Sequence, residues 1–156
     1  MARVMQRSFL GVFLAIPLSA KSDQAPPPPY LMTGANTVTI AVEWDAESLV
    51  GVVPEALESV ENLSGGINVY FVEGGTGITP YSSAYAYLDV KDPANDGATA
   101  RHILGGWYGP DPKVSLAMQT YFAAPVETGA STQNPNGNEW IGRGGDETGT
   151  IRACCV

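Results

Sequence analysis

The stretch that decides the fold of this chain is Tyr81-Ser82-Ser83-Ala84-Tyr85-Ala86-Tyr87-Leu88-Asp89-Val90. Large and small side chains alternate along it, which is the period of a β-strand whose two faces meet different surroundings. Tyr81, Tyr85 and Tyr87 fall on one face, and Ala84 and Ala86 fall on the other. We expect the small face to pack closely against another layer, and the tyrosine face to be either a cavity lining or a cross-strand aromatic ladder.

Further elements are predicted on both sides of this strand. Residues 36–43, 67–73 and 101–107 have the alternation or the flanking glycines of strands. Residues 45–51 predict a short helix capped by Asp45. A second helix follows Asp111 and Pro112, with Val114, Ala117, Met118 and Tyr121 on its apolar side. These patterns predict a mainly β (α+β) domain with two short helices.

Composition narrows the class of protein. The 156 residues suit one domain, and 18 glycines with 12 prolines are more than a helical bundle tolerates. The net charge is −8, and the lysines are Lys21, Lys91 and Lys113, which are too scattered to form a cationic face. We therefore expect no nucleic acid among the partners.

The chain divides into three predicted regions. Residues 1–29 form an N-terminal segment and polyproline linker, 30–126 the domain proper, and 127–156 a segment rich in Gly, Asn and Thr, where only Trp140 and Ile141 hint at a strand. Residues 8–18 are apolar and resemble a signal peptide, but they are too short to span a membrane. Cys154 and Cys155 are adjacent, so we interpret them as an exposed pair on a frayed tail. No zinc-ligand spacing occurs, and we expect no metal.

Several of these segments together resemble the acetoacetate decarboxylase family. The most specific is Val52-Val53-Pro54-Glu55-Ala56-Leu57-Glu58; Pro29-Tyr30, the glycine-rich turn before Tyr81 and the helix ending before Pro125 accompany it. The similarity runs from about residue 16 to about residue 126. It implies an antiparallel β-barrel or cone with an internal cavity, and in this chain we expect the barrel to be incomplete. It also implies decarboxylation of a small β-keto acid through a lysine Schiff base. Because the resemblance also covers residues 15–19, it favours a cytoplasmic protein over a secreted one with a signal peptide in residues 1–20.

The functional positions of the family are altered in this sequence. The resemblance places its arginine at Ala35, two glutamates at Asn68 and Ser83, and the Schiff-base lysine at Val126. None of these four residues is charged. Lys113 is no replacement, because Asp111 beside it would keep its amine protonated. We therefore expect that Schiff-base decarboxylation has been lost.

Three functional hypotheses follow. The first is a binder of a small keto acid or related carbonyl metabolite, without a cofactor; its candidate cavity lining is Tyr81, Ser83, Tyr85, Tyr87, Trp107, Met118 and Tyr121. The second is a carboxy-lyase or hydro-lyase that uses other acid–base groups, for which Glu43, Glu73, Asp89, His102 and Glu127 are available. The third is a truncated family member with a structural or interaction role. Four or five strands leave unpaired edges, so we expect a homo-oligomer.

Overall fold

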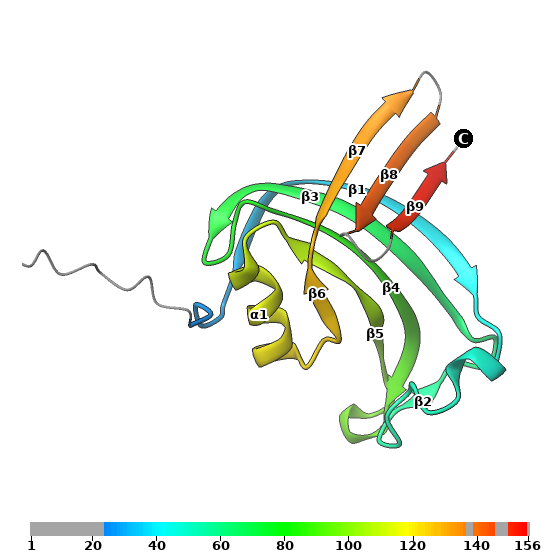
Figure 1. The fold of residues 1–156 in the computed structure, drawn as a ribbon. Coiled ribbons are helices and arrows are strands. Elements are labelled where there is room, and N and C mark those ends of the chain that lie inside the picture. The colour runs from blue at the N-terminus through cyan, green and yellow to red at the C-terminus, as the bar shows by residue number, and fades with distance from the viewer. Residues whose placement is uncertain (1–23, 137–138, 146–149, 156) are drawn as a thin grey trace, which may run out of the picture.

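The computed structural model describes residues 24–136, 139–145 and 150–155, which form two β-sheets and one α-helix (Figure 1). The larger sheet has the order β1-β3-β4-β5-β6, with β2 paired to β4, and the smaller has the order β7-β8-β9. The strands are β1 (Leu31–Glu43), β2 (Glu58–Ser59), β3 (Ser64–Thr76), β4 (Tyr81–Asp92), β5 (Ala98–Gly109), β6 (Val126–Thr128), β7 (Ala130–Asn136), β8 (Glu139–Gly145) and β9 (Thr150–Cys155). The helices are α1 (Pro112–Phe122) and the 3₁₀ turns η1 (Glu47–Leu49) and η2 (Pro93–Asn95).

The predicted mainly β fold is confirmed; of the two predicted helices the second is α1, whereas the first is only the three-residue 3₁₀ turn η1. Each of the four predicted strands is present and extends beyond its predicted bounds, because pairing with a neighbour continues past the alternating residues. The barrel is not closed, which agrees with the expected incomplete barrel: the larger sheet is an open arch (Figure 1). The sheet is also not purely antiparallel, because α1 carries the chain back across it, so that β6 runs parallel to β5.

Helix α1 begins and ends where its sequence indicates. The Asp111 side chain accepts a hydrogen bond from the Lys113 backbone N–H at 3.0 Å, and Pro112 occupies the first turn. The helix ends at Ala123, which adopts the left-handed conformation with φ of 50°. Val114 and Ala117 are buried against the sheet, so the apolar side of the helix holds it inside the arch (Figure 1).

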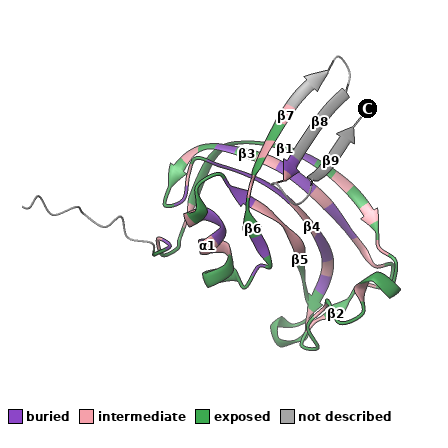
Figure 2. Ribbon diagram, viewed as in Figure 1, coloured by how far each residue is buried: buried purple, intermediate pink, exposed green. Residues whose placement is uncertain are grey.

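The larger sheet has two different faces. Its concave face packs on α1, and its other face carries β7–β9 (Figure 1). Buried residues lie along β3 and β4 and at the C-terminal end of β5 (Figure 2). Side by side on the concave face lie, row by row, Val72 and Tyr81; Tyr70, Ser83, Tyr108 and Thr128; Asn68, Tyr85, Gly106 and Val126; Gly66, Tyr87 and Ile103; and Asp89 and Arg101.

A bulge in β5 sets the register of these rows. The pairing between β4 and β5 shifts between Ala86 and Tyr87, and Gly106 opposite Tyr85 has φ of 147°. A Cβ atom at Gly106 would lie 2.3 Å from the Ala84 carbonyl oxygen and 2.5 Å from Tyr85 Cα. Only glycine fits at this position, because the two strands approach more closely than a side chain permits.

The C-terminal region is more ordered than its sequence indicates. Three strands occupy it, and Cys154 and Cys155 end β9, so the prediction of a frayed tail is wrong. The signal-peptide-like residues 8–18 lie outside the described residues. In the described ranges no helix has both the length and the apolar character needed to cross a bilayer.

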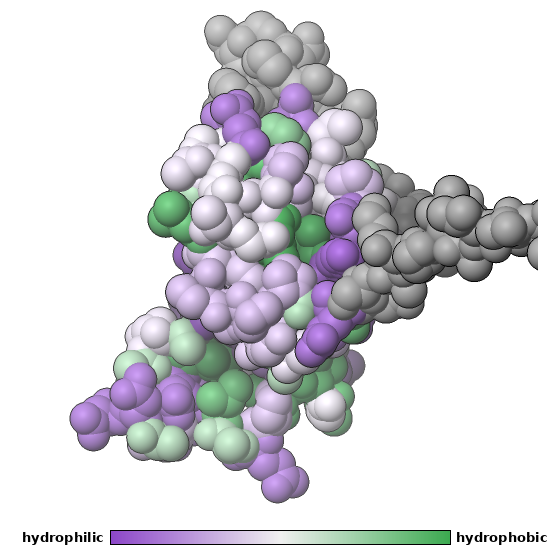
Figure 3. Space-filling view, turned by 90° about the vertical axis from the view of Figure 1, so that its left-hand side faces the viewer, coloured by the Kyte–Doolittle hydropathy of each residue, from purple (hydrophilic) through white to green (hydrophobic). Residues whose placement is uncertain are grey.

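The outer surface of the described residues carries both hydrophobic and hydrophilic side chains. Figure 3 shows the side of the molecule that lies on the left of Figure 1, where hydrophobic residues gather mainly in the lower part and hydrophilic residues border them. The exposed large hydrophobic residues come from separate elements: Leu31 and Met32 from β1, Phe71 from β3, Phe122 from α1, and Val50 and Val52 from the loop after η1.

Candidate functional site

Five tyrosines line the concave face of the larger sheet. They are Tyr70 from β3, Tyr81, Tyr85 and Tyr87 from β4, and Tyr108 from β5, and we call them the tyrosine face. Neighbouring rings have centroids 5.8 to 6.3 Å apart, in edge-on, tilted and stacked arrangements. These distances are typical of favourable aromatic pairs. The cross-strand aromatic ladder, one of the two alternatives for this face, is therefore present.

At the end beneath α1 the tyrosine hydroxyls bind one another. Tyr70 Oη donates to Tyr108 Oη at 3.3 Å and lies 3.3 Å from Tyr81 Oη, which donates to Met32 Sδ at 2.8 Å. Burial, before all other causes, raises the pKa of Tyr70, Tyr81 and Tyr108 above the ordinary tyrosine value. These phenols therefore stay neutral at physiological pH: they can donate a hydrogen bond to an acceptor, but they are not general bases.

A cavity of about 450 Å³ opens beside this buried end. It is lined by Pro28, Pro29, Tyr30, Met32, Tyr70, Ile78, Tyr81, Met118 and Phe122. Its walls are almost wholly apolar apart from the tyrosine hydroxyls. The cavity thus suits an apolar group better than a charged one.

Two buried polar side chains lie in the middle of the tyrosine face. Asn68 is 5% exposed, and its Nδ2 donates to Tyr85 Oη at 2.9 Å. Ser83 is 1% exposed and lies between Tyr70 and Tyr108 in its row. Asn68 Oδ1 and Ser83 Oγ make no hydrogen bond of ordinary geometry, although the Ser83 hydroxyl lies close enough to Tyr108 to oppose the rise in the Tyr108 pKa. An unpaired buried polar atom costs about 1–3 kcal/mol, so both atoms are places where a ligand would gain hydrogen bonds.

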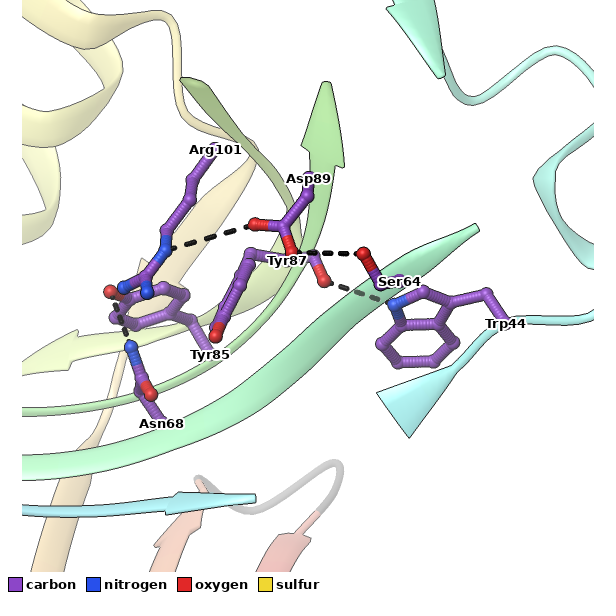
Figure 4. A network of polar contacts seen from close by, with 7 residues as sticks. All are labelled: Trp44, Ser64, Asn68, Tyr85, Tyr87, Asp89 and Arg101. Carbon is purple, nitrogen blue, oxygen red and sulfur yellow. Dashed lines mark hydrogen bonds and ion pairs between the residues drawn. The ribbon is translucent and has the colours of Figure 1, made fainter. Parts of the chain in front are cut away.

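The other end of the tyrosine face is open and charged (Figure 4). Arg101 lies over the Tyr87 ring, with Cζ 4.4 Å from its centroid, and its Nε is 3.9 Å from Asp89 Oδ1. Asp89 Oδ2 accepts a hydrogen bond from Ser64 Oγ at 3.2 Å, and Trp44 Nε1 donates to the Tyr87 carbonyl at 3.0 Å. This network holds a guanidinium next to a hydrogen-bonded pair of Asn68 and Tyr85.

The structure brings together some of the predicted lining residues and separates others. Tyr81, Ser83, Tyr85, Tyr87 and Met118 all lie on the concave side, between the sheet and α1. Trp107 lies on the opposite face against Val38, Val69 and Ala84, because neighbouring residues of a strand point to opposite sides and Tyr108 takes the concave one. Tyr121 is 38% exposed, and its hydroxyl donates to the Ala25 carbonyl at 3.4 Å.

The four residues at the family's functional positions are similarly divided. Asn68 and Ser83 lie on the tyrosine face, and Val126 is buried beside Gly106 in the same row as Asn68. Ala35 is exposed on β1. Three of these positions therefore share one surface, which carries amide, hydroxyl and methyl groups where the resemblance would place charges.

The alternative acid–base residues are dispersed. Glu43, Glu73 and Glu127 are exposed on three different strands, and Asp89 faces Arg101. His102 Nε2 lies 3.3 Å from the Val52 carbonyl. Among the described side chains, no group of three or more His, Cys, Asp or Glu lies close enough to hold a metal ion. The structure does not assemble these five residues into an acid–base site.

Two residues of the site were missed by the sequence reasoning. The strand that contains Tyr70 was predicted from its glycines and apolar residues, which do not single out Tyr70. The alternation on β3 does place Tyr70 on the same face as Asn68. Arg101 is an isolated charge at the start of a predicted strand, and no local pattern links it with Tyr87. Pairing of 67–73 with the tyrosine strand would have found Tyr70, but only the register of β4 and β5 reveals Arg101.

Comparison of structures identifies this architecture as the acetoacetate decarboxylase-like fold. Acetoacetate decarboxylase from Legionella pneumophila superposes with a TM-score of 0.69 at 16% identity, over 95% of this chain and 58% of that one. The enduracididine biosynthesis enzyme MppR, complexed with the condensation product of pyruvate and imidazole 4-carboxaldehyde, gives 0.68 at 13% identity, over 96% and 63%. The chain thus spans about three fifths of the length of these two structures. No protein-family model and no curated protein sequence matches it significantly.

Proposed function

We propose that this chain binds a small keto acid or a related carbonyl compound on its tyrosine face and does not decarboxylate it through a Schiff base. The observation that carries the proposal is the pair of buried, unpaired polar atoms, Asn68 Oδ1 and Ser83 Oγ, in the middle of that face. The Ser83 hydroxyl can donate to a carbonyl or carboxylate oxygen, whereas Asn68 Oδ1 is itself an acceptor and pairs with a ligand donor, such as the hydroxyl of an enol tautomer. Both similar structures come from enzymes, and one of them was solved with a pyruvate-derived compound.

The positions of the described lysines support the loss of Schiff-base chemistry. An iminium forms only on an unprotonated amine next to the substrate, and burial or a neighbouring cation is what lowers the pKa of such an amine. Lys91 is exposed near the end of β4, and Lys113 lies in the first turn of α1 beside Asp111. Val126 occupies the position that the resemblance assigns to the reactive lysine. Neither described lysine is therefore placed to attack a carbonyl group on the tyrosine face.

Ligand-induced stabilisation tests the binding. Pyruvate, acetoacetate and 2-oxoglutarate would each be titrated while the melting temperature is recorded. A ligand present at about 100 times its Kd adds about 2.7 kcal/mol to the free energy of unfolding, or roughly 5–10 °C in a domain of this size. We expect at least one of these acids to give such a shift in the melting temperature without being consumed by the protein. If none of them shifts the melting temperature, the proposal is wrong and a structural role is favoured.

A pair of asparagine variants locates the site. Asn68→Ala removes the buried amide, whereas Asn36→Ala removes an exposed asparagine from β1. The ligand-induced shift should fall strongly in Asn68→Ala and stay unchanged in Asn36→Ala. Equal shifts in the two variants would contradict binding at the tyrosine face.

Borohydride trapping tests the chemistry. The chain would be incubated with acetoacetate or pyruvate and borohydride, and its intact mass measured. We expect no reduced adduct. An adduct on Lys113 would overturn the loss of Schiff-base chemistry, and release of carbon dioxide without an adduct would favour a lyase with other acid–base residues.

A further inference from the structure

We propose that Arg101 binds the carboxylate of the ligand at the open end of the tyrosine face, with Tyr85 Oη donating a hydrogen bond to the neighbouring ketone oxygen. The inference rests on the proposed keto-acid binding and adds to it a location and a charge-recognising residue. Nothing in the resemblance assigns a role to Arg101.

The guanidinium is held in place but keeps its hydrogen-bond donors. It stacks on the Tyr87 ring at 4.4 Å, which fixes its plane. Its Nε is 3.9 Å from Asp89 Oδ1, which is an ion pair but too long for a hydrogen bond. No described acceptor hydrogen-bonds to either Nη group. A planar pair of N–H donors is therefore available for the two oxygens of a carboxylate.

Neighbouring groups suit the rest of a small keto acid. Asn68 Nδ2 donates to Tyr85 Oη, so the Tyr85 proton is free to be donated to a ligand oxygen. Asn68 Oδ1 is unpaired, but as an acceptor it pairs only with a ligand donor such as an enol hydroxyl. In Figure 4 the side chains of Arg101, Tyr85, Tyr87 and Asn68 converge from β3, β4 and β5.

The buried end of the tyrosine face is a poor place for the same carboxylate. The cavity of about 450 Å³ there is lined by apolar groups and neutral phenols and contains no cationic side chain. Moving a carboxylate from water to such a site without a paired charge is strongly unfavourable. Among the lysine and arginine side chains that the structure describes, Lys91 and Lys113 have no contact with the tyrosine rings, and Arg101 is the one that can compensate the charge.

A charge-matched pair of variants tests the inference. Arg101→Gln removes the guanidinium, and Lys91→Gln removes the same unit of charge from an exposed position on β4. Calorimetric titration with pyruvate should give a Kd about ten- to a hundredfold weaker for Arg101→Gln and unchanged within about twofold for Lys91→Gln. Arg101→Lys should be intermediate, because an ammonium cannot pair with two carboxylate oxygens in one plane. Circular dichroism checks that all three variants are folded.

Acetone provides the matched neutral ligand. It has the ketone of pyruvate but no carboxylate. The wild type and Arg101→Gln should therefore give the same result with acetone, whether or not acetone binds. The inference is overturned if pyruvate binds the wild type, Arg101→Gln and Lys91→Gln equally well, and in that case the proposed function stands. Failure of pyruvate, acetoacetate and 2-oxoglutarate to bind the wild type contradicts both.

Chemical modification gives a second readout that needs no variant. The Arg101 side chain is 56% exposed, so phenylglyoxal should modify it, and peptide mass spectrometry can follow the modified site. Pyruvate should slow the modification of Arg101, and acetone should not. Equal rates with and without pyruvate, at a pyruvate concentration that shifts the melting temperature, would place the carboxylate elsewhere.

Discussion

The two ends of the tyrosine face use the same side chain in different ways. Beneath α1, Tyr70, Tyr81 and Tyr108 bind one another, and burial keeps them neutral. At the open end, Tyr87 lies under the Arg101 guanidinium, and Tyr85 pairs with Asn68. In the first arrangement the tyrosine hydroxyls form hydrogen bonds with one another, whereas the second arrangement leaves hydrogen-bond donors and an acceptor without partners. The difference teaches that unused hydrogen-bonding groups, more than the tyrosines as such, mark the end that recognises a ligand.

The largest expected effect is on stability at the buried end. Tyr108→Ala removes a ring that is 3% exposed and contacts Tyr70, Tyr81 and Tyr85, so it should lower the free energy of unfolding by about 3–5 kcal/mol. Arg101→Gln, at the open end, should lower it by less than about 1 kcal/mol, because an exposed ion pair and a surface cation–π contact contribute little. Urea unfolding of both variants measures the contrast. If both variants lose the same free energy of unfolding, the open end contributes as much to core stability as the buried end does.

Alkaline pH should also destabilise the buried end. Because the pKa values of Tyr70 and Tyr108 are raised in the folded chain, above about pH 10 the unfolded chain binds fewer protons than the folded chain. Stability is therefore unaffected by these groups below that pH and falls above it, by at most about 1.4 kcal/mol per pH unit for each tyrosine. Urea unfolding between about pH 9 and about pH 11 measures the slope. Tyr70→Phe should make it shallower, and an unchanged slope would contradict the assignment.

A smaller effect of opposite sign is expected in the middle of the face. Ser83→Ala removes a buried hydroxyl that has no partner, so it should raise the free energy of unfolding by up to about 1 kcal/mol while weakening keto-acid binding. Ser115→Ala is the matched control, because its buried hydroxyl donates to the Pro112 carbonyl and pairs with Thr128. That variant should lose about 1 kcal/mol. Destabilisation of Ser83→Ala would show that its hydroxyl is satisfied in solution.

Local patterns in the sequence predict most of the fold. Alternation at 81–90 correctly predicts both faces of β4, and the Asp111-Pro112 start correctly predicts α1, since these signals act within a few residues. The extent of β1 is longer than predicted because Leu31 pairs with Thr76, which no local pattern contains. The parallel β6 likewise depends on where α1 packs.

The candidate site is only partly predictable for the same reason. The face of the tyrosines follows from period two, and the same rule would have separated Trp107 from Tyr108 if applied to β5. The contact of Arg101 with Tyr87 depends on the bulge opposite Ala86 and Tyr87, which shifts the register of one strand past the other. Such a shift comes from tertiary packing, because it joins residues that are distant in the chain.

The junction between the two sheets restricts how this chain can vary. A Cβ atom at Gly144 would lie 2.0 Å from Ala84 Cβ, so β8 and β4 approach with no room for one more methyl group. A saturation library selected for folding alone should therefore tolerate almost no replacement at Gly144, whereas the exposed Arg101 should accept many. Over evolutionary time this arrangement lets the ligand specificity of the concave face diverge while the opposite face keeps the same small residues.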